Sequence, residues 1–168
     1  LYIDGKKKGR QESLCTPHIY DLNEYIGTGI HEMTICVSNV GYKTKGGHLT
    51  SPDTQTNWNG ITGRIELIGY KNAHAENVML WCDIHSKTVR VTAEITGGKS
   101  GKVVISAESF NSEKNHTPAV QSFEYTNGKL DALYKMGDDC LLWSEHEPNL
   151  YKLRIDIDGD MSEHIIGM

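Results

Sequence analysis

Residues 88–95 read Thr88-Val89-Arg90-Val91-Thr92-Ala93-Glu94-Ile95 and alternate between two kinds of side chain. The apolar set is Val89, Val91, Ala93 and Ile95, and the polar set is Thr88, Arg90, Thr92 and Glu94. Successive side chains of a β-strand point to opposite faces of its sheet, so this period of two predicts a strand with one buried face and one wet face. The stretch therefore favours a layered β-protein.

Further strand signals lie on both sides of this stretch. Segments rich in β-branched and aromatic residues cover 1–4, 32–38, 63–70, 102–108, 120–125 and 150–157. Turn dipeptides separate the segments: Asp4-Gly5, Gly97-Gly98, Ser100-Gly101, Asn127-Gly128 and Asp158-Gly159. Turns that recur about every ten residues are typical of a sandwich or barrel. The one helix-like segment is a single turn at 21–26.

Composition and charge argue against several kinds of partner. The 168 residues contain 17 Lys and Arg against 22 Asp and Glu, and neither sign forms a long block. We therefore expect no nucleic-acid partner. No stretch approaches the roughly 20 apolar residues of a membrane-spanning helix, so we expect no membrane span.

Metal and cofactor motifs are also missing from the sequence. Cys15, Cys36, Cys82 and Cys140 are widely spaced, and no two histidines stand at the short spacings that metal sites use. Residues 156–160 resemble the start of a calcium loop, but the glycine that an EF-hand needs is replaced by Met161. We expect no metal and no cofactor, and a plain hairpin turn at Asp158-Gly159. The compartment stays open, with the periplasm or extracellular space favoured over the cytoplasm.

The glycine-rich segment 97–102 resembles a phosphate-binding loop only superficially. That motif would need glycine at position 93, where Ala93 stands. It would also need a following helix, whereas strand signals lie on both sides. A hairpin turn is the better interpretation.

Two domains are predicted, over residues 1–72 and 73–168. A polar segment at 71–76 separates one group of strands from the next. The first piece offers three or four strands, and two facing sheets normally need more. We therefore expect an incomplete sandwich in the first piece.

Residues 1–9, Leu1-Tyr2-Ile3-Asp4-Gly5-Lys6-Lys7-Lys8-Gly9, are followed by Thr16-Pro17-His18-Ile19-Tyr20-Asp21-Leu22-Asn23-Glu24-Tyr25-Ile26. A strand ending at Asn39 and the Trp58-Asn59-Gly60-Ile61 segment come next. This order resembles the sugar-binding domain of glycoside hydrolase family 2, which includes β-galactosidases, β-glucuronidases and β-mannosidases. The second piece contains Trp143-Ser144-Glu145-His146-Glu147-Pro148-Asn149-Leu150-Tyr151-Lys152-Leu153, which resembles a signature of that family's immunoglobulin-like domain.

The resemblance implies an all-β chain: the C-terminal half of a galactose-binding-like jelly roll over 1–72, then an immunoglobulin-like sandwich over 73–168. It also implies that the catalytic carboxyl groups lie in a barrel beginning where this chain stops. We therefore expect no catalytic residue here and no hydrolysis by this chain alone. The implied partners are a carbohydrate substrate and the barrel domain of the same parent chain. A stand-alone carbohydrate-binding or adhesion protein is the alternative.

A long polar loop at 40–59 holds the candidate substrate-binding residues. They are Asp53, Gln55, Asn57, Trp58 and Asn59, whose carboxylate, amides and indole are groups that hydrogen-bond and stack on sugars. Trp58 is equally well explained as a core anchor. The loop departs from the acidic and aromatic version of well-known β-galactosidases, so the sugar is left open.

A truncated jelly roll should also expose apolar side chains. Ile35, Val37, Ile65 and Leu67 are the residues that we expect at an uncovered patch or edge. Such a patch favours self-association.

Overall fold

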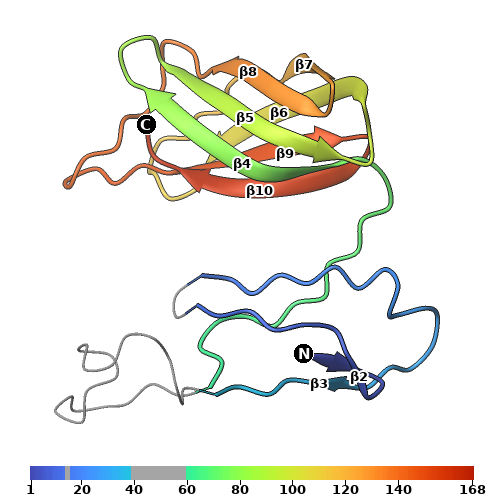
Figure 1. The fold of residues 1–168 in the computed structure, drawn as a ribbon. Coiled ribbons are helices and arrows are strands. Elements are labelled where there is room, and N and C mark those ends of the chain that lie inside the picture. Colours follow the sequence, from blue (N-terminus) through green and yellow to red (C-terminus); the bar gives the residue numbers. More distant parts are fainter. Residues whose placement is uncertain (14–15, 39–59) are drawn as a thin grey trace, which may run out of the picture. The chain divides into compact units, whose positions relative to one another are not determined.

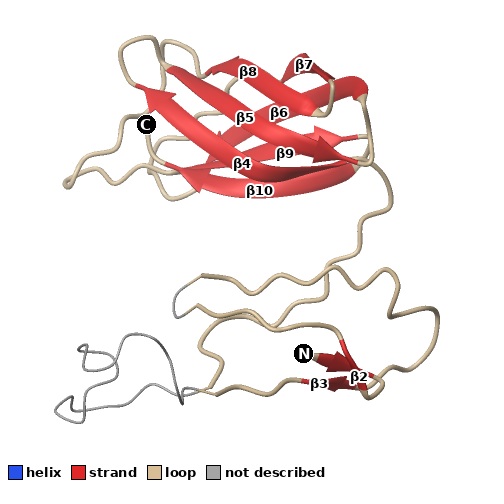
Figure 2. Ribbon diagram, in the orientation of Figure 1, coloured by secondary structure: helices blue, strands red, loops and turns tan. Residues whose placement is uncertain are grey.

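The computed structural model describes residues 1–13, 16–38 and 60–168 (Figure 1). The chain divides into two compact units, Leu1–Glu66 and Leu67–Met168, and each is described by itself. Every regular element in the described residues is a β-strand (Figure 2), which confirms the predicted all-β class. The domain boundary between residues 72 and 73 stays a prediction.

The first unit contains a small antiparallel sheet in the order β2-β1-β3. Its strands are β1 (Tyr2–Ile3), β2 (Lys6–Lys7) and β3 (Met33–Thr34). Asp4 and Gly5 join β1 to β2 with φ values of 49° and 75°, the backbone of a type I′ turn. The predicted single turn at 21–26 is present, since the N–H groups of Tyr25 and Ile26 both donate to the carbonyl of Leu22.

The second unit is a seven-stranded antiparallel sheet in the order β10-β9-β6-β7-β8-β5-β4. The strands are β4 (His74–Asp83), β5 (Thr88–Thr96), β6 (Ser100–Ser109), β7 (Gln121–Thr126), β8 (Lys129–Lys135), β9 (Tyr151–Ile157) and β10 (Asp160–Ile166). Strands β7 and β8 pair only where Thr126 faces Lys129. The sheet therefore folds into two layers, β4-β5-β8 and β7-β6-β9-β10, and its outer strands β4 and β10 lie near each other (Figure 1).

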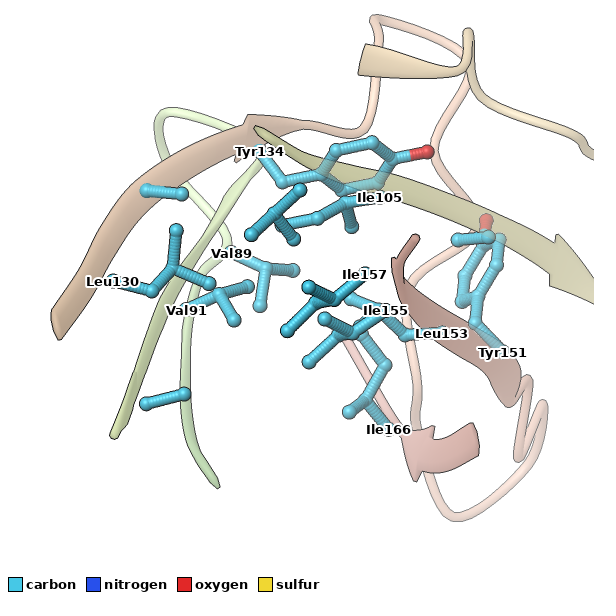
Figure 3. Packing of buried hydrophobic residues seen from close by; sticks show 14 of the residues in the cluster. Val89, Val91, Ile105, Leu130, Tyr134, Tyr151, Leu153, Ile155, Ile157 and Ile166 are labelled. Carbon is cyan, nitrogen blue, oxygen red and sulfur yellow. The ribbon is translucent and has the colours of Figure 1, made fainter. Parts of the chain in front are cut away.

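The core of the second unit fills the space between these layers (Figure 3). Val89 and Val91 of β5 are fully buried, and they face Ile155 and Ile157 of β9 across the interior. The alternation predicted for residues 88–95 is thus correct on its apolar side. Two threonines depart from it on the polar side: Thr88 is only 7% exposed, with its hydroxyl 2.8 Å from that of Ser86, and the hydroxyl oxygen of Thr92 is buried.

The predicted strand at 63–70 is wrong. No strand forms there, and Ile65 and Leu67 are 61% and 75% exposed. Apolar, β-branched composition favours a strand only when a neighbouring strand supplies backbone partners. Among the described residues, this segment has no such partner.

Candidate functional site

The predicted substrate-binding residues lie outside the described residues. Asp53, Gln55, Asn57, Trp58 and Asn59 all fall within 39–59. Their assignment to sugar contact therefore stays a prediction. The described residues offer two other features to examine: the loop that carries the tryptophan-to-leucine signature, and a groove beside the β9–β10 hairpin.

The signature loop connects β8 to β9 and is held by its own hydrogen bonds. Trp143 forms an isolated antiparallel bridge with Pro148. The hydroxyl of Ser144 accepts from the N–H of Glu147 at 3.0 Å, and the side-chain amide of Asn149 donates to the carbonyl of Leu142 at 2.9 Å. These contacts fold the loop back on itself before β9 begins.

Tyr151, the tyrosine of the signature, anchors this loop to the sandwich. Its ring is fully buried, and its hydroxyl oxygen accepts from the N–H of Leu141 at 2.7 Å. The same oxygen lies 2.8 Å from Nδ1 of His116, in the loop between β6 and β7. Burial raises the pKa of Tyr151, so the phenol stays protonated. The signature thus has a structural role that its sequence alone did not reveal.

Hydrogen bonds hold three of the described carboxyl groups in their charged form. The pKa values of Asp4, Asp83 and Asp131 are all lowered, chiefly by hydrogen bonds from His31, the His85 N–H and Arg90 respectively. A general acid needs the opposite shift. Asp4, Asp83 and Asp131 therefore do not suit the role of the acid.

A groove runs between residues 68–74 and the β9–β10 hairpin of the second unit. It consists of two adjoining cavities of about 300 and 460 Å³ that share Gly69, Asp160 and Met161. We call it the hairpin groove. The other lining residues are Ile68, Tyr70, Lys71, Asn72, His74, Ala75, Ile155, Asp158, Gly159 and Ser162.

An aromatic pair forms one wall of the hairpin groove. The rings of Tyr70 and His74 stack with centroids 3.5 Å apart and an angle of 1° between their planes. Nε2 of His74 lies 3.1 Å from a carboxylate oxygen of Glu76, which fixes the imidazole in turn. No pattern in the sequence predicted this wall, since Tyr70 lies at the end of a predicted strand and nothing local links it to the distant hairpin.

The opposite wall is the turn between β9 and β10. Asp158 and Gly159 have φ values of 53° and 86°, and Oδ1 of Asp156 accepts the N–H of Gly159 at 2.8 Å. The predicted hairpin turn at Asp158-Gly159 is confirmed. In the part of the chain that the structure describes, no three metal-ligating side chains gather, and no helix is long and apolar enough to span a membrane.

Comparison with known proteins adds a family match. A model of the family described as "Glycosyl hydrolases family 2" matches residues 73–168. A β-galactosidase of Clostridium acetobutylicum is 21% identical over 97% of this chain and 18% of its own length. The β-galactosidase large subunit of Lactobacillus acidophilus is 22% identical over 99% of this chain and 26% of that subunit.

A third relative has a similar identity and a similarly small share of its length covered. A β-galactosidase of Leuconostoc mesenteroides is 23% identical over 98% of this chain and 17% of its own length. The chain thus spans only 17% to 26% of these curated relatives.

Proposed function

This chain belongs to glycosyl hydrolase family 2, and we propose that it forms the non-catalytic, sugar-binding and immunoglobulin-like region of a longer β-galactosidase-like enzyme. The observation that supports this most is the pattern of coverage. Almost all of the chain aligns with β-galactosidases, yet it covers only 17% to 26% of their length. On this proposal the first unit is part of a jelly roll, and the second is the immunoglobulin-like domain.

Hydrolysis of a β-glycosidic bond needs one carboxyl group as acid or base and a second as nucleophile or base. The lowered pKa values of Asp4, Asp83 and Asp131 do not suit the acid. We propose that a barrel domain of the same longer protein supplies both groups. Leu142 and Trp143, 44% and 52% exposed on the signature loop, give that domain an apolar surface to contact.

Substrate contact by this region is proposed for the loop that holds Asp53, Gln55, Asn57, Trp58 and Asn59. Carboxylate and amide groups supply the acceptors and donors that sugar hydroxyls need, and an indole can stack on a pyranose ring. The loop would wall one side of the sugar pocket while the barrel performs the chemistry.

Two substitutions in the longer protein test this role. Asp53→Ala and Asn57→Ala should lower kcat/KM for a β-galactoside while leaving the melting temperature nearly unchanged, because side chains in a polar loop contribute little to folding. Asn23→Ala, in the exposed turn at 21–26, is the matched control and should change neither quantity. Normal kinetics in both loop variants would leave the loop with only a structural role.

A further inference from the structure

We propose that the hairpin groove is a second carbohydrate site, which holds one neutral hexopyranose ring against Tyr70. The chemical class of the ligand rests on the proposed function. The choice of site residues does not rest on it, because all of them belong to the second unit and none belongs to the loop at 53–59. Three features of the groove favour such a ligand: the stacked aromatic wall, the open polar groups opposite it and the net charge of the lining.

The aromatic wall is a fixed platform. His74 covers one face of the Tyr70 ring, and yet the residue as a whole is 48% exposed and lines the cavity. The exposed area must therefore lie on the other face and at the edge of the ring. The C–H face of a pyranose packs against such an aromatic surface, and the backing imidazole reduces the freedom that the tyrosine would lose on binding.

Polar groups without protein partners line the rest of the groove. The side chains of Lys71, Asp158 and Asp160 form no hydrogen bond or ion pair with any other described residue. The two carboxylates accept hydrogen bonds from sugar hydroxyls, and the ammonium donates. Asp156 differs, since its carboxylate is already used to brace the turn. Asp156 thus braces the turn, while the carboxylates of Asp158 and Asp160 keep no partner among the described residues.

The size and the charge of the hairpin groove limit the class of ligand that it can bind. The cavity next to Tyr70 has a volume of about 300 Å³, at the lower end of ligand sites, which suits a single ring. Two carboxylates against one ammonium give the lining a net negative charge, so a uronic acid or phosphorylated sugar is disfavoured. A neutral hexose residue, free or at the end of a glycan, fits both limits.

The experiment is an amide chemical-shift titration of the 168-residue chain with methyl β-D-galactopyranoside. The amides of Lys71, Gly159 and Met161 should shift and saturate, with a Kd on the order of 1 mM. Tyr70→Ala should abolish the shifts, and Asp160→Asn should weaken binding by about tenfold. Trp81→Ala is the matched control, because Trp81 is 59% exposed on β4 and does not line the groove, and it should bind as the parent does.

Shifts that do not saturate, that persist in Tyr70→Ala, or that sodium glucuronate produces at equal concentration would overturn the proposal. If Tyr70→Ala disturbs the fold, the Asp160→Asn variant still decides the matter. Failure here is distinct from failure of the proposed function, because the loop at 53–59 is tested by kcat/KM in the longer protein. Either result can hold without the other.

Discussion

At the scale of single residues, the hydroxyl of Tyr151 joins three segments of the second unit. It receives a hydrogen bond from the Leu141 N–H, lies beside His116 and belongs itself to β9. This arrangement matches the tyrosine corner of immunoglobulin-like sandwiches, in which a tyrosine at the start of a strand bonds back to the preceding backbone. The signature at 143–153 therefore contains the residue that anchors its loop to the sandwich.

Removing that hydroxyl should destabilise the second unit. Tyr151→Phe leaves the Leu141 N–H without its acceptor, and such a loss costs about 1–3 kcal/mol of the free energy of unfolding. Urea unfolding followed by tryptophan fluorescence measures the difference. Tyr70→Phe, at a half-exposed position, should change the free energy by less than about 0.5 kcal/mol. Equal urea midpoints for Tyr151→Phe and Tyr70→Phe would contradict an anchoring role of the Tyr151 hydroxyl.

The pair of His31 and Asp4 gives the first unit a pH-dependent link. Nδ1 of His31 lies 2.7 Å from Oδ2 of Asp4, and this contact raises the pKa of His31 above its ordinary 6.5 and lowers that of Asp4 below 3.8. The stability that charged His31 gives the folded first unit is fully present below pH 6.5 and is lost as the pH rises through its raised pKa. The stability that charged Asp4 gives is fully present above pH 3.8 and is lost as the pH falls through its lowered pKa. The link is therefore strongest between these values.

The imidazole signals of His31, followed by NMR against pH, check this link. In the parent chain, His31 should titrate above its ordinary range. Asp4→Asn should return the titration toward 6.5, because the hydrogen bond that the imidazole donates to the Asp4 carboxylate is the largest cause of the raised pKa. Asp21→Asn is the control, since that carboxylate caps the N–H of Asn23 instead. If the pKa of His31 were the same in Asp4→Asn as in the parent chain, Asp4 would not be the cause of its raised value.

At the scale of elements, the side chain of Gln121 closes the gap that opens between β7 and β8. The two strands meet at the Asn127-Gly128 turn and then separate into different layers. At the far end, the Gln121 amide donates to the Lys135 carbonyl at 2.8 Å and accepts from the Lys135 N–H at 3.1 Å. One side chain thus replaces the pair of bonds that a neighbouring strand would supply.

Gln121→Ala should release that end of β8. The Lys135 N–H loses its acceptor, so its hydrogen exchange should accelerate and the second unit should lose about 1 kcal/mol of stability. Exchange measured by NMR gives the answer residue by residue. Ser122→Ala, the neighbouring exposed position of β7, should leave the exchange of Lys135 unchanged. If the Lys135 N–H kept its protection from exchange in Gln121→Ala, the Gln121 side chain would not be what holds this end of β8.

The strands show which parts of the fold the sequence could predict. Strand β5 was predicted because its alternation is unbroken. Strand β4 was not, since a bulge between Glu76 and Met79, with Asn77 at a φ of 51°, interrupts its period of two. Strand β8 carried a clear signal in the alternating residues 129–135, which was overlooked, whereas β10 is polar along most of its length.

The candidate sites were harder to predict than the strands. The hairpin groove brings Tyr70 beside Asp160, and only tertiary packing joins two such distant parts of the chain. No spacing rule in the sequence could indicate that. The loop at 53–59 was selected on composition alone, and its role stays a prediction.

At the scale of the whole molecule, exposed apolar side chains suggest self-association. Ile35 and Val37 are 40% and 52% exposed, and Ile65 and Leu67 more so, as the sequence led us to expect. Apolar surface of this kind favours contact with another copy when nothing else covers it. We propose that the chain associates through these residues.

Light scattering on the purified chain checks this proposal. The apparent mass should rise with concentration, and the double variant Val37→Ser with Leu67→Ser should reduce that rise. Thr34→Ser, an exposed position nearby in β3, serves as the control. A strictly monomeric particle at high concentration, with no binding of a hydrophobic dye, would count against self-association.

We propose that this chain is a non-catalytic region of a family 2 glycosidase. The most direct test compares hydrolysis of nitrophenyl β-galactoside by the purified 168-residue chain and by the product of the complete reading frame that encodes it. We predict a reading frame that continues into a barrel-length segment, with turnover by its product and none by the chain alone. Turnover by the 168-residue chain that a single substitution within it abolishes would contradict the account.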